Sequence, residues 1–355
     1  MKKIFLAFLI VANLSSLSRA FSQKLQEVTI VNWNLQCFFD SVTEGTEYTE
    51  FIKSKGWSRA AYEERLNKLC DCIKKIKADI YVFEEVENHG VVMDISNRLC
   101  DYSFNKKKNW NYAAFAKNPG ESIGCAVLSR LPIEDFTVHA LDIRTESEKQ
   151  PSMRPIMKVK VLCEGELIIL VNHWKSKSGG EEKSEVWRNW QELHLSNLFT
   201  ECLEECSNVI ACGDFNRDVG EFSITGECTA RGERLFSLGS STETSGTTTA
   251  STISSALTKT TTSTTTGIEA FNFKVAKVKN PWIKSNGKLV EPGSYYYKGE
   301  FERIDSFFIA PELFVSEFTP LLGPWCSDDG IPNKFQISSG QGYSDHLPVS
   351  CTLQL

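Results

Sequence analysis

The feature of this sequence that most constrains its fold is a set of short apolar runs that end in polar side chains. Five such runs have the length and composition of buried strands: 28–33, 80–83, 123–128, 167–171 and 209–212. Stretches 59–77 and 181–203 instead carry apolar residues at helical spacing. The pattern favours an α/β or α+β layout, in which strands pack beneath helices.

Polar side chains follow four of these runs directly, at the point where each strand is expected to end. They are Asn34, the pair Glu84-Glu85, the pair Asn172-His173, and Asp214 with Asn216. Near the C-terminus the order is reversed, because Asp305 and Asp345-His346 precede apolar runs. In sheets with antiparallel pairing, the ends of some strands and the starts of others share one rim. We therefore expect the six polar clusters to converge on a single pocket.

The chemistry of these side chains indicates a hard divalent cation. Carboxylate and amide oxygens suit Mg²⁺ or Mn²⁺, whereas zinc would require more histidine or cysteine. None of the 12 cysteines forms a CxxC pair, which argues against a clustered zinc site. Asp345 and His346 would diverge on a regular strand, so they require a turn, which Gly340 and Gly342 favour.

Six short motifs follow one another along the chain. They are Asn32-Trp33-Asn34-Leu35-Gln36, Glu84-Glu85-Val86-Glu87-Asn88, Asn172-His173-Trp174-Lys175-Ser176, Gly213-Asp214-Phe215-Asn216-Arg217, Arg303-Ile304-Asp305 and Ser344-Asp345-His346-Leu347-Pro348. In this order they resemble the endonuclease/exonuclease/phosphatase superfamily, and the segment after His173 is similar to its secreted bacterial nucleases. The resemblance implies a four-layer α/β sandwich, with two mixed β-sheets packed face to face and helices outside.

The resemblance also implies a metal site. Asn34, Glu85 and Asp345 are expected to ligate the cation, with Mg²⁺ as the first expectation and Mn²⁺ as the alternative. The family usually has glutamine before the metal-binding glutamate, and here that position is Glu84. A second carboxylate at this point would alter the preference for one metal over another.

The catalytic roles that the resemblance implies fall on five residues. Asp214 is expected to orient and deprotonate the attacking water, with Asn216 beside it on the phosphate or the metal. His346, held by Asp305, is expected to contact the phosphate, and His173 to assist the leaving oxygen. For His173 a core histidine without a catalytic role is the competing interpretation. A Gly-Asp-x-Asn turn without chemistry is the alternative for Asp214 and Asn216.

Three basic residues are candidates for binding the substrate. Arg154 resembles a phosphate-facing arginine of some family branches. Lys175 and Lys177 resemble lysines of secreted nucleases and would touch a nucleic-acid backbone. For all three residues, an ordinary solvent-exposed side chain is the alternative.

The N-terminal segment indicates export. Residues 1–20 combine Lys2-Lys3, a short apolar run and small residues before a cut after Ala20, as a signal peptide does. An uncleaved anchor is the alternative, although the run is too short for an ordinary spanning helix. Cleavage would change the formal net charge from −6 to −9. We expect a secreted or periplasmic protein without stable membrane insertion.

The mature region 21–355 is expected to form one domain, because its motifs belong to one site. A Thr/Ser-rich stretch at about 239–267 interrupts it. Such a stretch lacks the apolar side chains needed to offset its ordering entropy, so we predict a disordered insertion.

The function expected from these features is metal-dependent hydrolysis of phosphodiester bonds in DNA or RNA, without sequence specificity. Because phosphodiesters are anionic and unreactive, their hydrolysis requires charge neutralisation and a positioned base. A phospholipid or inositol phosphate substrate, as for a sphingomyelinase, is the alternative. A catalytically silent interaction protein is the third hypothesis, which the intact set of acids and histidines disfavours. No protein partner is predicted.

Overall fold

The computed structural model describes residues 26–101, 109–142, 149–222 and 276–355. The predicted signal peptide at 1–20 and the Thr/Ser-rich stretch at 239–267 lie outside the described residues. Residues on both sides of the gap at 223–275 contribute strands to the same two sheets. Within the described ranges, no helix is long and apolar enough to cross a membrane.

The first sheet has six strands in the order β12-β13-β1-β2-β4-β3. Their bounds are β1 Glu27–Phe38, β2 Ile80–Val86, β3 Tyr112–Ala116, β4 Gly124–Ser129, β12 Phe314–Pro320 and β13 Val349–Gln354. Strands β1 and β2 run parallel, whereas the other neighbours are antiparallel. The sheet is therefore mixed.

The second sheet has five strands in the order β11-β8-β7-β6-β5. Their bounds are β5 Ile133–His139, β6 Ile156–Cys163, β7 Gly165–His173, β8 Val209–Asp214 and β11 Asp305–Ile309. Only β7 and β8 run parallel among these described strands. A separate hairpin is formed by β9 Tyr295–Tyr297 and β10 Glu300–Glu302.

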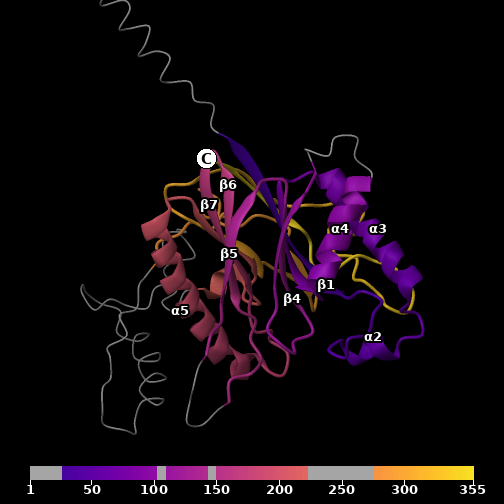
Figure 1. The fold of residues 1–355 in the computed structure, drawn as a ribbon. Helices are drawn as coiled ribbons and strands as arrows, with labels where there is room; N and C mark the ends of the chain where they lie inside the picture. Colours follow the sequence, from indigo (N-terminus) through magenta and orange to yellow (C-terminus); the bar gives the residue numbers. More distant parts are fainter. Residues whose placement is uncertain (1–25, 102–108, 143–148, 223–275) are drawn as a thin grey trace, which may run out of the picture.

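Helices cover the outer faces of the two sheets (Figure 1). They are α2 Thr49–Lys53, α3 Arg59–Ile76, α4 His89–Asp101 and α5 Glu181–Glu205, with a short 3-10 turn η2 at Val219–Glu221. Figure 1 shows α5 on one side of the sheets and α3 with α4 on the other. The predicted four-layer α/β sandwich is confirmed.

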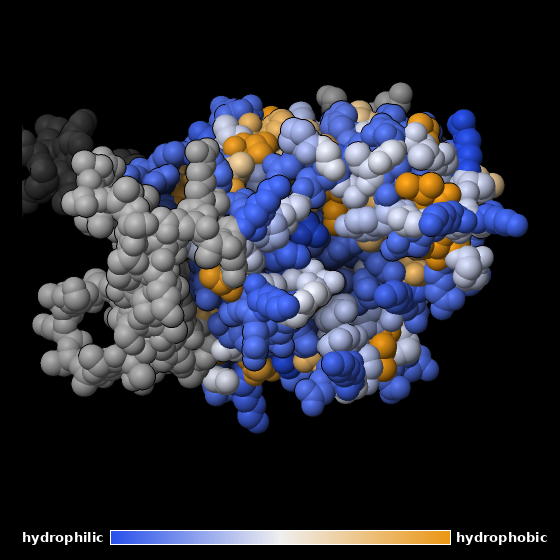
Figure 2. All heavy atoms as spheres, turned by 90° about the horizontal axis from the view of Figure 1, so that it is seen from below, coloured by the Kyte–Doolittle hydropathy of each residue, from blue (hydrophilic) through white to orange (hydrophobic). Residues whose placement is uncertain are grey.

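The alternation of side chains along β1 explains the layers. Val28 and Ile30 pack into the core between the two sheets, whereas Val31, Trp33 and Leu35 pack into a second core toward α3 and α4. Because side chains alternate across a strand, Asn34 belongs to the inter-sheet face. Figure 2 shows the surface from below the view of Figure 1, largely hydrophilic and with a recess near its middle.

Candidate active site

Strand register brings the predicted polar residues to one rim. In the first sheet Asn34 lies opposite Glu84 on the parallel pair β1-β2. In the second sheet Asp214 lies opposite His173 on β7 and opposite Asp305 on β11. All five side chains except that of Glu84 were assigned to the site from the sequence, and each of the five is buried. The two facing sheets thus each contribute one polar edge.

His346 is held between two carboxylates. Its Nδ1 lies 2.7 Å from Asp305 Oδ2, and its Nε2 lies 4.0 Å from Asp214 Oδ2. Burial alone would lower the pKa of His346, but the Asp305 carboxylate, its hydrogen bond and the charge of Asp214 raise this pKa well above 6.5. Burial raises the pKa of Asp214 to about 7, against the opposing effect of the His346 charge. The geometry pairs an imidazolium with Asp305 and leaves Asp214 as a separate carboxylate.

Asn34 links the two sheets through its side-chain amide. Its Nδ2 donates to Asp214 Oδ2 at 3.0 Å and to Glu85 Oε1 at 3.3 Å. His173 Nε2 lies 3.6 Å from Asp214 Oδ2 and 3.9 Å from Glu85 Oε1. Burial, with smaller contributions from the charges of Arg154 and His346, lowers the pKa of His173 well below 6.5. His173 is therefore neutral beside two carboxylates, unlike His346.

Asn216 and Asp345 also lie beside this cluster. Asn216 donates its backbone N–H to Asp214 Oδ1 at 2.8 Å and its side-chain amide to the Trp174 carbonyl at 3.2 Å. Asp345 Oδ1 lies 4.0 Å from His346 Nε2. The Ser344 hydroxyl donates to the Asn34 carbonyl at 2.6 Å, which ties the turn before β13 to β1.

A left-handed bulge at the end of β1 positions Glu85. Gln36 and Cys37 have φ angles of 51° and 53°. The Cys37 backbone N–H donates to Glu85 Oε2 at 2.7 Å, and its thiol lies 3.0 Å from the same oxygen. Glu85 itself has a positive φ of 62°. Because such angles are unfavourable for residues other than glycine, surrounding contacts must hold this backbone in place.

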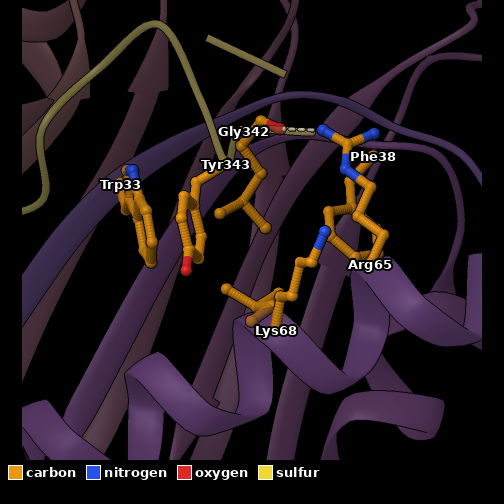
Figure 3. Close-up of a pocket in the computed structure, with 8 residues that line it drawn as sticks. Trp33, Phe38, Arg65, Lys68, Gly342 and Tyr343 are labelled. Atoms are coloured by element: carbon orange, nitrogen blue, oxygen red, sulfur yellow. Dashed lines mark hydrogen bonds between the residues drawn. The ribbon is translucent and has the colours of Figure 1, made fainter. Parts of the chain in front are cut away.

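Arg65 on α3 supplies those contacts. Its guanidinium donates to the backbone carbonyls of Leu35, Gln36 and Cys37 at 2.7, 2.8 and 2.9 Å. It also lies over the ring of Phe335, 3.7 Å from the centroid, and is only 3% exposed. Figure 3 shows Arg65 rising from α3 toward β1 in a small pocket on the helix side of the sheet. That pocket is separate from the polar rim, because Trp33 and Leu35 line it while Asn34 points to the other face.

Close packing of two backbones requires glycine at position 213, directly before Asp214. The φ of Gly213 is +145°, and an added Cβ would lie 1.9 Å from the Asn172 carbonyl oxygen. A side chain at this position would push β8 away from β7. The close approach of the two backbones sets Asp214 level with His173.

A sequence model of the endonuclease/exonuclease/phosphatase family matches residues 29–237. The match spans more than half of the 355 residues and includes Asn34, Glu85, His173 and Asp214. The chain belongs to the endonuclease/exonuclease/phosphatase family. Enzymes of this family are metal-dependent hydrolases of phosphodiester bonds, so the chain is an enzyme of that class. No curated protein matches its sequence.

Solved structures of family members show the same fold at low sequence identity. The catalytic domain of human nocturnin is 15% identical with a TM-score of 0.53, covering 92% of this chain and 94% of nocturnin. A humanized D. rerio TDP2 carrying 14 mutations is 13% identical with a TM-score of 0.52, covering 93% and 99%. A family protein from Bacteroides thetaiotaomicron is 14% identical with a TM-score of 0.51, covering 94% and 96%. These likenesses support the fold alone.

The donor set fits the divalent cation that the family uses. Asp214, Asp305 and His346 place one potential ligand atom each within 4.8 Å of one another. The predicted ligand Asn34 contacts Asp214, and the predicted ligand Glu85 accepts a hydrogen bond from the same Asn34 amide. In the described part of the chain, one oxygen of Asp305 and one of Glu84 are buried without a hydrogen-bond partner. Oxygen donors of this kind and concentrated negative charge suit a hard cation.

Glu84 adds a further buried carboxyl group to the rim. It is fully buried and accepts a hydrogen bond from the Asn32 amide at 3.4 Å. Burial, together with the charges of Asp305 and Asp214, raises the pKa of Glu84 well above 4.5. The family glutamine is thus replaced by an acid that faces the same cluster from the first sheet.

The three predicted substrate-binding residues have different surroundings. The charge of Arg154 lowers the pKa of both His173 and Lys175, which places Arg154 near the rim. Burial is the first cause of the lowered Lys175 pKa. Lys177 is engaged in ion pairs with Glu221, Glu302 and Glu181, at 3.1, 3.7 and 3.2 Å. Lys177 must exchange these partners before it can contact a phosphate.

Tyr295 lies beside the rim, whereas Tyr112 does not. Tyr112 pairs with Ser129 at one end of β4, whereas Glu84 pairs with Cys125 at the other end, so Tyr112 lies away from the rim. Tyr295 instead forms a β-bridge with His346, and its ring centroid lies 4.8 Å from that of His346. The position of Tyr295 shortly before Asp305 is the one sequence feature that could have indicated its proximity to the rim.

Proposed function

We propose that this enzyme is an endonuclease without sequence specificity, which hydrolyses phosphodiester bonds in DNA or RNA with Mg²⁺ as its cofactor. The observation that carries the proposal is the gathering of Asp214, His346 and Asp305 at one buried rim, beside Asn34 and Glu85. These groups come from segments far apart in the sequence, and their types match the needs of phosphodiester hydrolysis.

Asp214 is the general base of the proposed reaction. Its Oδ1 accepts the Asn216 backbone N–H and its Oδ2 accepts the Asn34 amide, so the carboxylate is fixed in orientation. A pKa raised to about 7 by burial gives this carboxylate more basicity than an exposed aspartate has. A divalent cation, when bound, offsets the charge of the phosphate and of the leaving oxygen.

His346 is the phosphate-contacting residue. Asp305 holds its Nδ1 at 2.7 Å, which directs Nε2 toward the space beside Asp214. An imidazolium in this position donates a charge-assisted hydrogen bond to a phosphoryl oxygen. His173, whose pKa is lowered mainly by burial, donates a hydrogen bond from a neutral ring to the leaving oxygen and does not act as a proton reservoir.

The test compares the wild type with Asp214→Asn on supercoiled plasmid, RNA, sphingomyelin vesicles and inositol phosphates, with Mg²⁺ or with EDTA. Asp329→Asn is the matched control, because Asp329 is exposed and outside the rim. We expect plasmid or RNA cleavage that EDTA abolishes and that Asp214→Asn lowers by roughly 10²- to 10⁴-fold. Hydrolysis of only the lipid or the inositol phosphates would replace the nuclease proposal by the phospholipid or inositol-phosphate alternative. If the Asp214→Asn protein had the same biological effect as the wild type, the hypothesis of a catalytically silent interaction protein would be favoured.

We further propose that the protein is exported, as the pattern at residues 1–20 indicates. N-terminal sequencing of the protein recovered outside the cytoplasm is expected to begin at Phe21. A protein retained in the cell with Met1 in place would refute export without affecting the enzymatic proposal.

A further inference from the structure

A pair of stacked tyrosines lies beside the phosphate-contacting histidine. Tyr295 and Tyr297 stand on the same face of β9, with ring centroids 6.2 Å apart and an interplanar angle of 19°. The Tyr295 ring lies 4.8 Å from the His346 ring at an angle of 36°. The three rings therefore form a continuous aromatic series that starts at the proposed phosphate site and leads away from it.

The hairpin that carries this series is fixed to the catalytic strands. The Ser294 carbonyl accepts a hydrogen bond from the Leu347 N–H at 2.7 Å, and the Ser294 hydroxyl accepts one from the Asp305 N–H at 3.2 Å. Tyr296 points to the opposite face and packs on Phe301, its cross-strand partner. The positions of Tyr295 and Tyr297 are thus coupled to the residues that flank Asp305 and His346.

The outer end of the series is open to ligand. The Tyr297 residue is 49% exposed, and Lys298 Nζ lies 5.0 Å from its ring centroid. The carboxylate of Glu302, on the same face, is paired with Lys177 at 3.7 Å. An aromatic face with a flexible cation above it suits a flat, anionic group better than an aliphatic chain.

We propose that Tyr297, supported by Tyr295, is a stacking site for the nucleobase of a nucleotide next to the scissile phosphate. The inference rests on the proposed nuclease function and specifies its substrate contact. The tip of the hairpin is Lys298-Gly299-Glu300, all exposed. A hairpin that inserts into a membrane would carry apolar side chains at its tip, so the composition disfavours lipid contact.

The binding mode follows from the spacing of the rings. At a centroid separation of 6.2 Å, Tyr295 and Tyr297 leave too little room for a base between them. The base therefore stacks on the outer face of Tyr297, and the Lys298 side chain moves aside to pair with a phosphate. Stacking of a base on an aromatic side chain tolerates any sequence, which agrees with an enzyme without sequence specificity.

The experiment measures kcat and KM on a dithymidine phosphodiester and on two analogues, each lacking one of the two bases. The variants are Tyr297→Ala, Tyr297→Phe, and Tyr112→Ala as an exposed tyrosine at the far end of the first sheet. We expect Tyr297→Ala to raise KM about ten-fold on the dithymidine substrate. It should leave kcat unchanged, and it should have no effect on the analogue that lacks the stacked base. Tyr297→Phe should retain wild-type values, because the ring remains.

A binding measurement separates this inference from the proposed function. An oligonucleotide containing 2-aminopurine is titrated with Asp214→Asn protein, with and without Tyr297→Ala, and stacking is read as fluorescence quenching. Cleavage with no dependence on Tyr297 in either assay overturns the stacking site and leaves the nuclease standing. Quenching that requires Tyr297, without any cleavage by the wild type, overturns the nuclease and leaves the base site. An equal rise in the KM of Tyr297→Ala on the dithymidine substrate and on both analogues would overturn the nucleobase assignment. The same conclusion would follow if Tyr297→Ala lost only binding to sphingomyelin vesicles.

Discussion

Asp305 Oδ2 and His346 Nδ1 lie 2.7 Å apart, although 41 residues separate them in the sequence. Asp305 begins β11 in the second sheet, and His346 precedes β13 in the first. The hydrogen bond therefore crosses the sandwich at its rim. It fixes which imidazole nitrogen faces Asp214, because Nδ1 is already occupied.

We expect Asp305→Asn to lower kcat by about 10²- to 10⁴-fold while the protein remains folded. The amide is similar in shape but cannot stabilise a positive imidazole, so His346 loses charge and the preferred orientation of its ring. Steady-state kinetics on plasmid or dinucleotide substrates measures the loss, and Asp328→Asn, which alters an exposed acid, is the control. An unchanged kcat in Asp305→Asn would contradict the assigned role.

The pH dependence of catalysis should reflect Asp214. Burial raises its pKa to about 7, and only the carboxylate form is a base, so kcat/KM should fall as pH drops through this value. Mg²⁺ favours the carboxylate, and a higher concentration should therefore move the acidic limb to lower pH. Profiles recorded at two Mg²⁺ concentrations test both statements. A limb at the ordinary aspartate value, independent of Mg²⁺, would show that another group controls the rate.

Arg65→Met should weaken both stability and metal binding. Three backbone carbonyls of the β1 bulge lose the guanidinium, and of these the Cys37 carbonyl keeps a further donor, the Phe39 N–H at 3.0 Å. Loss of these hydrogen bonds to a buried charged group should cost about 2–4 kcal/mol in the free energy of unfolding. The bulge also orients Glu85, so the Mg²⁺ dissociation constant should rise about 10- to 100-fold, as measured by calorimetry.

Lys68→Met is the matched control for Arg65→Met. Lys68 lines the same pocket from α3 but donates to one carbonyl, that of Gly340, at 2.8 Å. We expect this variant to lose under about 1 kcal/mol and to bind Mg²⁺ as the wild type does. Equal effects of the two substitutions would mean that Arg65 contributes general packing and does not position Glu85.

Gly213→Ala should destabilise the fold far more than Gly120→Ala. Both glycines have positive φ, 145° and 80°, but only at Gly213 would a Cβ collide with neighbouring backbone. We expect roughly 1 kcal/mol of strain for Gly120→Ala and more than about 3 kcal/mol for Gly213→Ala. Denaturant unfolding followed by circular dichroism measures the difference. Similar midpoints for the two variants would contradict the argued contact with Asn172.

Local patterns in the sequence predicted an α/β or α+β layout and the polar residues at the strand ends, whereas the four layers were implied by the family resemblance. Strands at 80–86 and 209–214 extend the predicted runs by a few residues into the polar motifs themselves. The helix Arg59–Ile76 ends one residue before the predicted boundary, where Lys77 adopts a left-handed conformation. Buried strands and helices of this kind can be recognised from the periodicity of their apolar residues.

The contacts that depend on three-dimensional packing were not predicted. Arg65 sits within an amphipathic helix, and nothing in its neighbours indicates that its guanidinium binds three carbonyls of β1. Tyr295 approaches His346 only because a hairpin folds back on the turn before β13. The strand at 156–163 also went unrecognised, since Lys158 and Lys160 interrupt its apolar run. Such contacts join residues that are distant in the sequence, so local patterns do not predict them.

The link between Asn34 and Asp214 across the two sheets has a consequence for the whole molecule. Neither sheet alone carries a complete set of reactive groups. A small movement of one sheet against the other would therefore separate the general base Asp214 from Asn34. Enzymatic activity should therefore be lost before the sheets unfold, and its loss would report the first loosening of contact between the two sheets.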